Sequence, residues 1–130
     1  MTTLALLTTA LLFGGMVLYS FGFAAFLFTA LPAETAGPTI RRAFPHFYLF
    51  VIAGAGLSAA FLALTDPFSA AIMATIAIYT IPTRQILMPA INAATDAGDK
   101  RRFGMLHGLS VVITLIHIVA AAYVLHRFIG

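Results

Sequence analysis

The sequence predicts an all-α membrane protein, a bundle of four transmembrane helices in antiparallel up-down order. Of 130 residues, 62% are hydrophobic and 8% are charged, whereas soluble domains carry about 25% charged residues. The mean hydropathy is +1.03. Four apolar segments are separated by short polar stretches, and a spanning helix needs roughly 20 such residues. We therefore expect a single domain over 1–130, neither soluble and globular nor disordered.

The apolar segments predict helices at about 2–31, 44–64, 68–87 and 103–129. Thirty residues in the first make about 45 Å, longer than the ~30 Å hydrocarbon core. This helix should tilt, protrude or bend near Gly14-Gly15, and it lacks the short apolar region of a typical signal peptide. In the third, Pro82 predicts a kink, with an interfacial tail over 86–96. Asp66 should cap that helix, with Pro67 at its first position.

The basic residues predict the orientation of the bundle. Six lie on one side, in or near the loops 32–43 and 88–102, and one lies on the other; in chain order the six are Arg41, Arg42, Arg84, Lys100, Arg101 and Arg102, and the one is Arg127. The positive-inside rule places these two loops in the cytoplasm and both termini outside. In a bacterial inner membrane, outside is the periplasm.

Several classes of chemistry lack their residues in this sequence. Cysteine is absent, which excludes disulfides, thiolate metal sites and cysteine nucleophiles. The sequence contains no phosphate-binding loop, nucleophile elbow, zinc-protease helix or dinucleotide fingerprint. The net charge of +3 is explained by membrane topology, so we expect no nucleic-acid partner. Catalysis has no evident candidates, and we lean toward a non-enzymatic protein.

His46 and His107 are candidate cofactor ligands. Each follows a pair of arginines and lies near the predicted cytoplasmic end of a helix. Two imidazoles at equal depth on adjacent helices have the geometry for bis-histidine haem ligation or half of a metal site. The alternative is that each is an interfacial residue bonded to backbone or lipid.

Arg84 lies between Pro82 and Pro89, near a helix end. Arginine at such a position extends toward the headgroups. The alternative is a cation facing the bundle interior, paired with Asp96, Asp99 or an anionic ligand.

Two further polar residues lie at membrane depth. His117 is near the middle of its helix, where histidine faces protein or water. We expect it to meet a hydroxyl of Thr75, Tyr19 or Ser20, with a proton relay as the sharper alternative. Tyr19 itself predicts an interhelical hydrogen bond.

Small residues mark where helices can approach one another. They are frequent in the second and third predicted helices, and the fourth begins with Gly104-x-x-x-Gly108. Such spacing allows close backbone packing in lipid. We expect packing within the chain, and the Gly104–Gly108 edge could also be a dimer or partner face.

Several short motifs resemble those of a known membrane family. They are Gly14-Gly15-Met16, the Phe-rich run 21–28, Leu31-Pro32, Ala36-Gly37, Phe44-Pro45-His46-Phe47-Tyr48, Asn92-Ala-Ala-Thr-Asp96 and Phe103-x-x-x-His107-Gly108. The chain resembles the four-helix family that includes vertebrate transmembrane protein 205 and bacterial members with a domain of unknown function. The resemblance implies four helices and membrane localisation, with drug or metal tolerance suggested for the vertebrate member. His46 and Phe47 depart from the family pattern.

These observations favour a non-enzymatic accessory or scaffold subunit, or a self-associating bundle. Its partners would be the lipid bilayer, a second copy or a larger membrane complex. One alternative is a haem- or metal-binding redox or sensing protein that uses His46 and His107. The other is a small transporter or exporter component gated near the Pro82–Pro89 break.

Overall fold

The computed structural model describes residues 2–130, in which helices join end to end into four long rods. The prediction of an all-α, four-helix protein is confirmed, because the described chain contains no strand. Two of the segments, η1 and η2, are π-helical. In order, the rods are α1 (Thr2–Val17), η1 (Leu18–Phe23) and α2 (Ala24–Ala30); α3 (Ala33–Leu62); α4 (Pro67–Pro82), η2 (Thr83–Leu87) and α5 (Met88–Asp96); and α6 (Lys100–Ile129).

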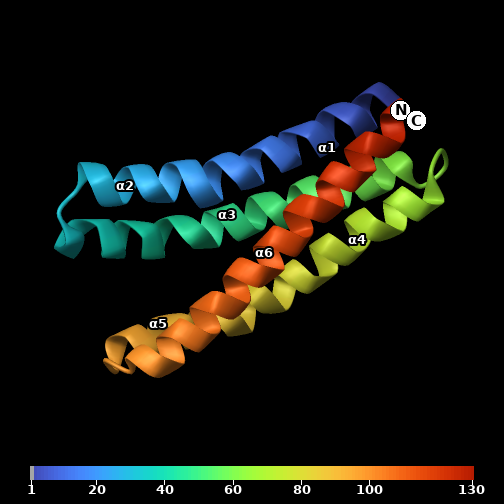
Figure 1. Ribbon diagram of the computed structural model, residues 1–130. Coiled ribbons are helices and arrows are strands. Elements are labelled where there is room, and N and C mark those ends of the chain that lie inside the picture. The colour runs from blue at the N-terminus through green and yellow to red at the C-terminus, as the bar shows by residue number, and fades with distance from the viewer. Residues whose placement is uncertain (1) are drawn as a thin grey trace.

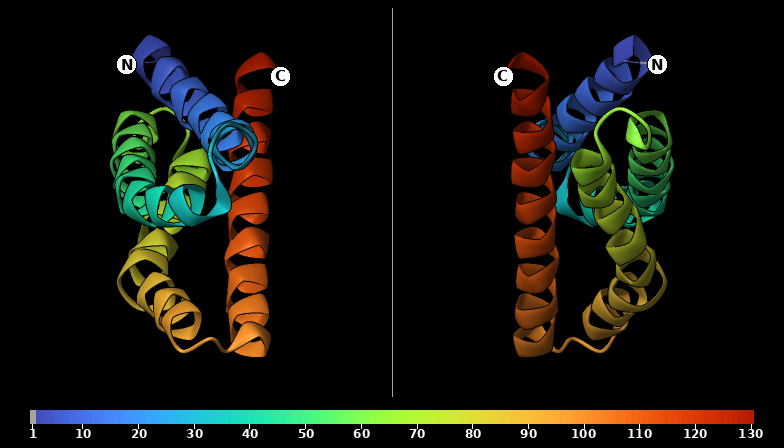
Figure 2. Two further views of the ribbon diagram at one scale, coloured as in Figure 1. Left: turned by 90° about the vertical axis from the view of Figure 1, so that its left-hand side faces the viewer. Right: turned by 90° about the vertical axis from the view of Figure 1, so that its right-hand side faces the viewer.

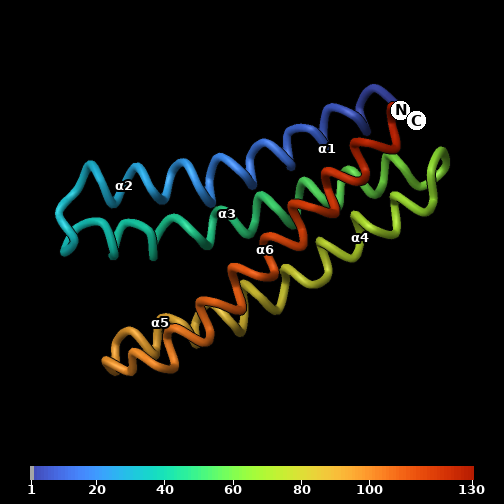
Figure 3. Tube along the Cα trace, in the orientation of Figure 1, coloured from blue at the N-terminus to red at the C-terminus, as the bar shows by residue number. Residues whose placement is uncertain are grey.

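The rods run up and down in chain order, so both termini lie at one end of the bundle (Figure 1). The first two rods form one hairpin and the last two form another. The hairpins pack together near the termini and splay apart toward α2 and α5 (Figures 1 and 3). We call the end with the termini and the 63–66 turn the closed end, and the end with the 31–32 and 97–99 turns the splayed end.

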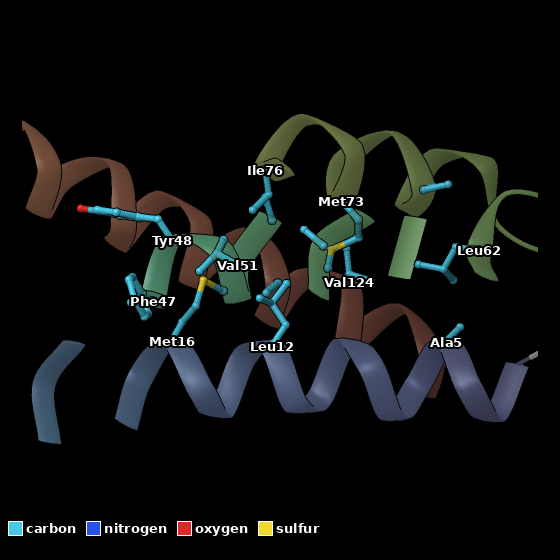
Figure 4. Packing of buried hydrophobic residues seen from close by; sticks show 13 residues of the cluster. Ala5, Leu12, Met16, Phe47, Tyr48, Val51, Leu62, Met73, Ile76 and Val124 are labelled. Atoms are coloured by element: carbon cyan, nitrogen blue, oxygen red, sulfur yellow. The ribbon is translucent and has the colours of Figure 1, made fainter. Parts of the chain in front are cut away.

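The apolar core lies where α1, α3, α4 and α6 meet (Figure 4). Leu12 and Met16 of α1 point into the space between Val51 of α3 and Met73 of α4, and these four side chains are almost fully buried. Val124 of α6 joins this core beside Met73, and Ala5 and Leu62 continue it toward the termini. The closed end is therefore the densely packed part of the bundle.

Local sequence determines where each rod begins and ends. Leu31 is extended (φ −120°, ψ 150°) because it precedes Pro32, and this ends the first rod. The Asp66 side chain accepts a hydrogen bond from the backbone N–H of Ser69, and Pro67 opens α4, as the sequence predicts. Gly98 adopts φ +67° after α5, the left-handed conformation in which glycine commonly ends a helix.

Three helix boundaries differ from those predicted. The second helix begins at Ala33 instead of 44, the third rod continues to Asp96 instead of ending near 87, and the fourth begins at Lys100 instead of 103. The predicted loops 32–43 and 88–102 are therefore largely helical. Each proline inside a helix removes only one backbone donor, and α2 packs on α3 as α5 packs on α6. That packing keeps the extensions helical outside the predicted spans.

The π-helical segments interrupt the first and third rods. Ala24 N–H bonds to the Tyr19 carbonyl and Met88 N–H to the Thr83 carbonyl, each five residues back. The first rod leaves α-helical geometry at Leu18, slightly after the predicted bend at Gly14-Gly15. The third rod leaves it directly after Pro82, where the sequence predicts a kink, and it bows away from the straight α6 (Figure 2).

All four rods are long and apolar enough to cross a membrane. They contain 29, 30, 30 and 30 residues, about 45 Å each at 1.5 Å per residue. Since a bilayer's hydrocarbon core is about 30 Å thick, the rods extend beyond it. The protein thus has the build of an integral membrane protein in which turns and helix ends supply the polar surface.

Candidate functional site: polar contacts and a lateral groove

Each π-helical segment directs one polar side chain at the same turn of α3. The Tyr19 hydroxyl, from η1, donates to the carbonyl of Ala43 at 2.8 Å. Arg84 Nε, from η2, donates to the carbonyl of Pro45 at 3.1 Å. The π geometry changes the direction in which a side chain points, and here it ties the first and third rods to one turn of the second. The interhelical hydrogen bond expected of Tyr19 is present.

Aromatic rings surround the Tyr19 side of this turn. The Tyr19 ring stacks on Phe47 with centroids 4.9 Å apart and meets Phe44 edge-on at 5.7 Å. Phe23, one helical turn later, lies 4.9 Å from the same ring. Such contacts contribute about 0.5–1.5 kcal/mol each beyond area burial, so the tyrosine is held by its ring as well as by its hydroxyl.

Arg84 has partners other than those predicted from the sequence. Its Nη1 donates to Gln85 Oε1 at 2.6 Å, and its Nε reaches the α3 backbone. Asp96 instead pairs with Arg41, with two N···O distances of 2.7 and 2.9 Å. Asp99 caps α6 by accepting from a backbone N–H. Arg84 therefore faces the bundle in part, as one alternative expected, but its interior partner is a carbonyl and not a carboxylate.

His117 lines a small enclosed space between α1, α3, α4 and α6. The space has a volume of about 10 Å³, and four other polar side chains contribute to its wall: Tyr48, Thr80, Thr83 and Thr114. A volume of ~10–15 Å³ holds one water molecule. The Thr80 and Thr83 hydroxyls donate to carbonyls one turn back, which leaves their oxygens free to accept. The half-buried imidazole thus lies beside threonine hydroxyls at a small space inside the bundle.

Of the three hydroxyls expected to meet His117, Thr75 lines the same groove as the imidazole, whereas Tyr19 and Ser20 do not. Tyr19 donates to α3. Thr75 donates to the Ala71 carbonyl and lines the outer groove described below, together with His117. Ser20 Oγ is buried and has no hydrogen-bond partner among residues 2–130. The threonines that do share the enclosed space with His117 were not singled out from the sequence, because their positions depend on how the rods rotate.

His46 lies on α3 and His107 lies on α6. Both are exposed, and the His107 ring stacks on Phe103 of its own helix, with centroids 5.3 Å apart and an interplanar angle of 7°. Within residues 2–130, no group of three or more His, Cys, Asp or Glu side chains could hold a metal ion. A metal site at His46 and His107 therefore has no third ligand of these types within residues 2–130, and haem ligation by the pair stays a prediction.

A charged network at the closed end was missed by the sequence reasoning. Arg127 Nη2 and Nε each lie 3.0 Å from an oxygen of Asp66, and Nε lies 2.9 Å from the Ser69 hydroxyl. The guanidinium also sits over the Phe68 ring, 4.9 Å from its centroid. The Arg127 guanidinium, followed by the Ser69 hydroxyl, holds the pKa of Asp66 well below its usual range. The up-down topology could have indicated this ion pair, because it places Asp66 and Arg127 at the same end of the bundle.

A buried hydrogen bond between Thr9 and Ser58 was also missed. Both side chains are fully buried, in α1 and α3. Because a hydroxyl in an apolar interior is costly without a partner, the pair fixes the register of these two rods. Neither residue was singled out from the sequence.

A lateral groove of about 790 Å³ separates the third rod from α6. Figure 2 shows that the third rod bows away from α6. Along α6 its lining residues recur every three or four positions from Arg102 through Leu109 and Ile113 to Ala120. His117 belongs to this groove and also to the enclosed space, so it lies between the bundle interior and the membrane-facing side.

Four apolar rods and a few polar interhelical contacts define the class of this molecule as a small helical membrane protein. The chain belongs to the family described as "Domain of unknown function (DUF4149)", which matches residues 7–100. The match begins within α1, covers the second and third rods and ends at the first residue of α6. No curated protein and no solved structure matches the chain.

Proposed function

We propose that this protein is a non-enzymatic accessory or scaffold subunit that packs against another transmembrane helix, from a second copy or a larger membrane complex. The docking edge would be the face of α6 formed by Gly104, Gly108, Val111 and Leu115. At 100° per residue these positions fall within about 60° of one another. All four are exposed. The observation that carries the proposal is a contrast between two sets of glycines.

Gly15 and Gly54 are enclosed by neighbouring rods. A Cβ at Gly15 would lie 2.5 Å from Phe50 Cε1, and one at Gly54 would lie 3.3 Å from Leu12 Cδ1. These two glycines allow α1 and α3 to approach closely. A Cβ at Gly104 or Gly108 would meet nothing within 4 Å. The same holds for Gly14, Gly37 and Gly56, but Gly104 and Gly108 are spaced four residues apart on one exposed face.

Glycine inside a helix costs about 1 kcal/mol relative to alanine. At Gly15 and Gly54 the close approach of two rods offsets that cost. At Gly104 and Gly108 no contact within the chain does so, and their spacing is the one that allows transmembrane helices to pack closely. A helix from outside the chain accounts for the pair.

Cysteine cross-linking in native membranes tests this edge, because the natural chain contains no cysteine. Val111→Cys should cross-link, either to a second copy or to a larger partner, and Gly108→Leu should abolish the product. Ile116→Cys, on the groove side of α6, is the control that should not cross-link. Equal cross-linking at both positions, or a product that survives Gly108→Leu, would contradict the proposal.

Three finer statements belong to the same proposal. The membrane would be the bacterial inner membrane, with the splayed end in the cytoplasm and both termini in the periplasm. The distribution of basic residues supports this orientation, since Arg41, Arg42, Arg84 and those at 100–102 are near the splayed end. Kinship with the family of vertebrate transmembrane protein 205 rests on the motifs quoted from the sequence.

The haem or metal hypothesis and the transporter hypothesis stay predictions, and no contact among residues 2–130 favours them.

A further inference from the structure

The lateral groove between the third rod and α6 is an unfilled surface whose walls are mostly apolar side chains. Its volume of about 790 Å³ lies within the ~300–1,000 Å³ typical of ligand sites. Because the groove opens sideways between two membrane-crossing rods, it faces the bilayer interior. Its occupant must therefore be apolar over most of its length.

One end of the groove carries a positive charge. Arg102 is the only charged residue in its lining, in the first turn of α6 and close to the 97–99 turn. No carboxylate within residues 2–130 forms an ion pair with its guanidinium, and the Asp99 side chain bonds to the backbone N–H of Arg102. Lys100 and Arg101 add positive charge beside it. A guanidinium binds phosphate oxygens well, so this end of the groove suits an anionic headgroup.

The dimensions of the groove favour an acyl chain over a helix. From Arg102 to Ala120 it follows 19 residues of α6, a rise of about 27 Å. That exceeds half of the ~30 Å hydrocarbon core, which is the depth of one leaflet. A helix with its side chains is about 10 Å wide, and the third rod and α6 stay in contact along the groove, which leaves no room for a helix between them. Lipid chains are narrower and enter from the side.

We propose that the groove binds an anionic phospholipid. Its phosphate would bind Arg102, and its acyl chains would lie along Leu109 and Ile113 toward His117. This site lies on nearly the opposite side of α6 from Gly104 and Gly108. It is therefore independent of the docking edge, and either proposal can fail alone.

Fluorescence quenching by brominated lipids tests the site, because the natural chain contains no tryptophan. Tyr79 lines the groove, and its neighbour Ile78 does not. Both side chains are 62% exposed, so Tyr79→Trp and Ile78→Trp form a matched pair at nearly the same depth. Each full-length variant is reconstituted into phosphatidylcholine vesicles with increasing brominated phosphatidylglycerol or brominated phosphatidylcholine.

In Tyr79→Trp, half-maximal quenching should need about fivefold less brominated phosphatidylglycerol than brominated phosphatidylcholine. In Ile78→Trp the two lipids should quench equally. Adding Arg102→Gln to Tyr79→Trp should remove the preference, whereas Arg101→Gln, outside the groove, should leave most of it.

Three results would overturn the lipid site. The first is equal quenching of Tyr79→Trp by the two lipids. The second is a preference that persists in the Arg102→Gln variant. The third is protection of Tyr79→Trp from both lipids relative to Ile78→Trp, which would mean that protein fills the groove. The cross-linking experiment probes the Gly104–Gly108 edge, on a different face of α6, and its outcome does not depend on these results.

Discussion

At the closed end, Leu12 and Met73 are fully buried among four rods, and a capped turn is locked by Arg127 of the last helix. At the splayed end, the hairpins diverge and are joined by the exposed Arg41–Asp96 pair. Further in, Tyr19 and Arg84 bond to the α3 backbone. Packing of apolar side chains therefore holds the closed end together, whereas a few polar contacts set the distance between the hairpins at the splayed end.

The largest expected effect is on the closed-end core. Leu12→Ala should lower the free energy of unfolding by about 2–5 kcal/mol, because it leaves a cavity among side chains that cannot collapse fully. Leu27→Ala, in α2 at the splayed end, should cost less, since Leu27 packs against fewer rods. Denaturation in detergent micelles measures both, with Leu11→Ala, 64% exposed, as the control. If Leu12→Ala and Leu27→Ala lower the free energy of unfolding equally, the closed end is not the more densely packed end.

The two helix caps allow a second comparison. Asp66 and Asp99 each accept a hydrogen bond from the third residue after them, at the start of α4 and α6. Asp99→Ala should cost about 1 kcal/mol, the usual loss for a cap. Asp66→Ala should cost more, because it also leaves Arg127 and the Ser69 hydroxyl without their acceptor. The same unfolding assay gives both values, and a larger loss for Asp99→Ala would contradict the closed-end network.

Acid should weaken the closed end through Asp66. Its pKa is lowered in the folded state, so its contribution to stability is fully present above its unfolded pKa of about 4 and is lost as the pH falls through the folded value. The Tm should therefore be insensitive to this group between pH 7 and 5 and should fall below about pH 4. In Asp66→Asn the decrease in Tm below about pH 4 should be smaller. If this variant keeps the wild-type dependence of Tm on pH, the acid effect belongs to other groups.

The smallest effect on stability should come from the splayed end. Arg41 and Asp96 have side chains 43% and 60% exposed, and such pairs contribute little. Arg41→Gln should leave the unfolding transition unchanged. It should broaden the distribution of distances between two spin labels, one on each hairpin, attached at Thr35→Cys and Ala93→Cys. Arg42→Gln, at an equally exposed neighbour, is the control. A narrow distribution in Arg41→Gln would mean that packing also fixes the spacing at this end.

The sequence predicted what depends on local order along the chain. Four apolar segments gave four rods, and the Asp66-Pro67 pair gave the start of α4. It did not predict Asp66 with Arg127 or Arg41 with Asp96, partners 61 and 55 positions apart. Those contacts depend on the rotation of each rod about its axis. The π-helical segments set part of that rotation, and nothing in the composition of 18–23 or 83–87 distinguishes them from α-helix.

The extended helix ends show a different limit. Prolines and charges at 32–43 and 88–102 predicted loops, because proline is costly inside an isolated helix. In the bundle, each extension packs against its hairpin neighbour and stays helical. The sequence predicts how deep in the membrane a candidate residue lies. Which partners it meets depends on the neighbouring rods. His117 is the clearest case, since the hydroxyls beside it come from α4, η2 and its own helix.

The two π-helical segments have an evolutionary meaning. A turn closed five residues back holds one residue more than an α-helical turn, so each segment is equivalent to a single-residue insertion that rotates everything beyond it by about 100°. A homologue lacking one residue within 18–23 or 83–87 would keep its hydrophobic length and its topology. It would turn α2 or α5 to a different face and lose the bond to Ala43 or Pro45. In alignments of this family, one-residue gaps at these two places would therefore separate members with different interior contacts.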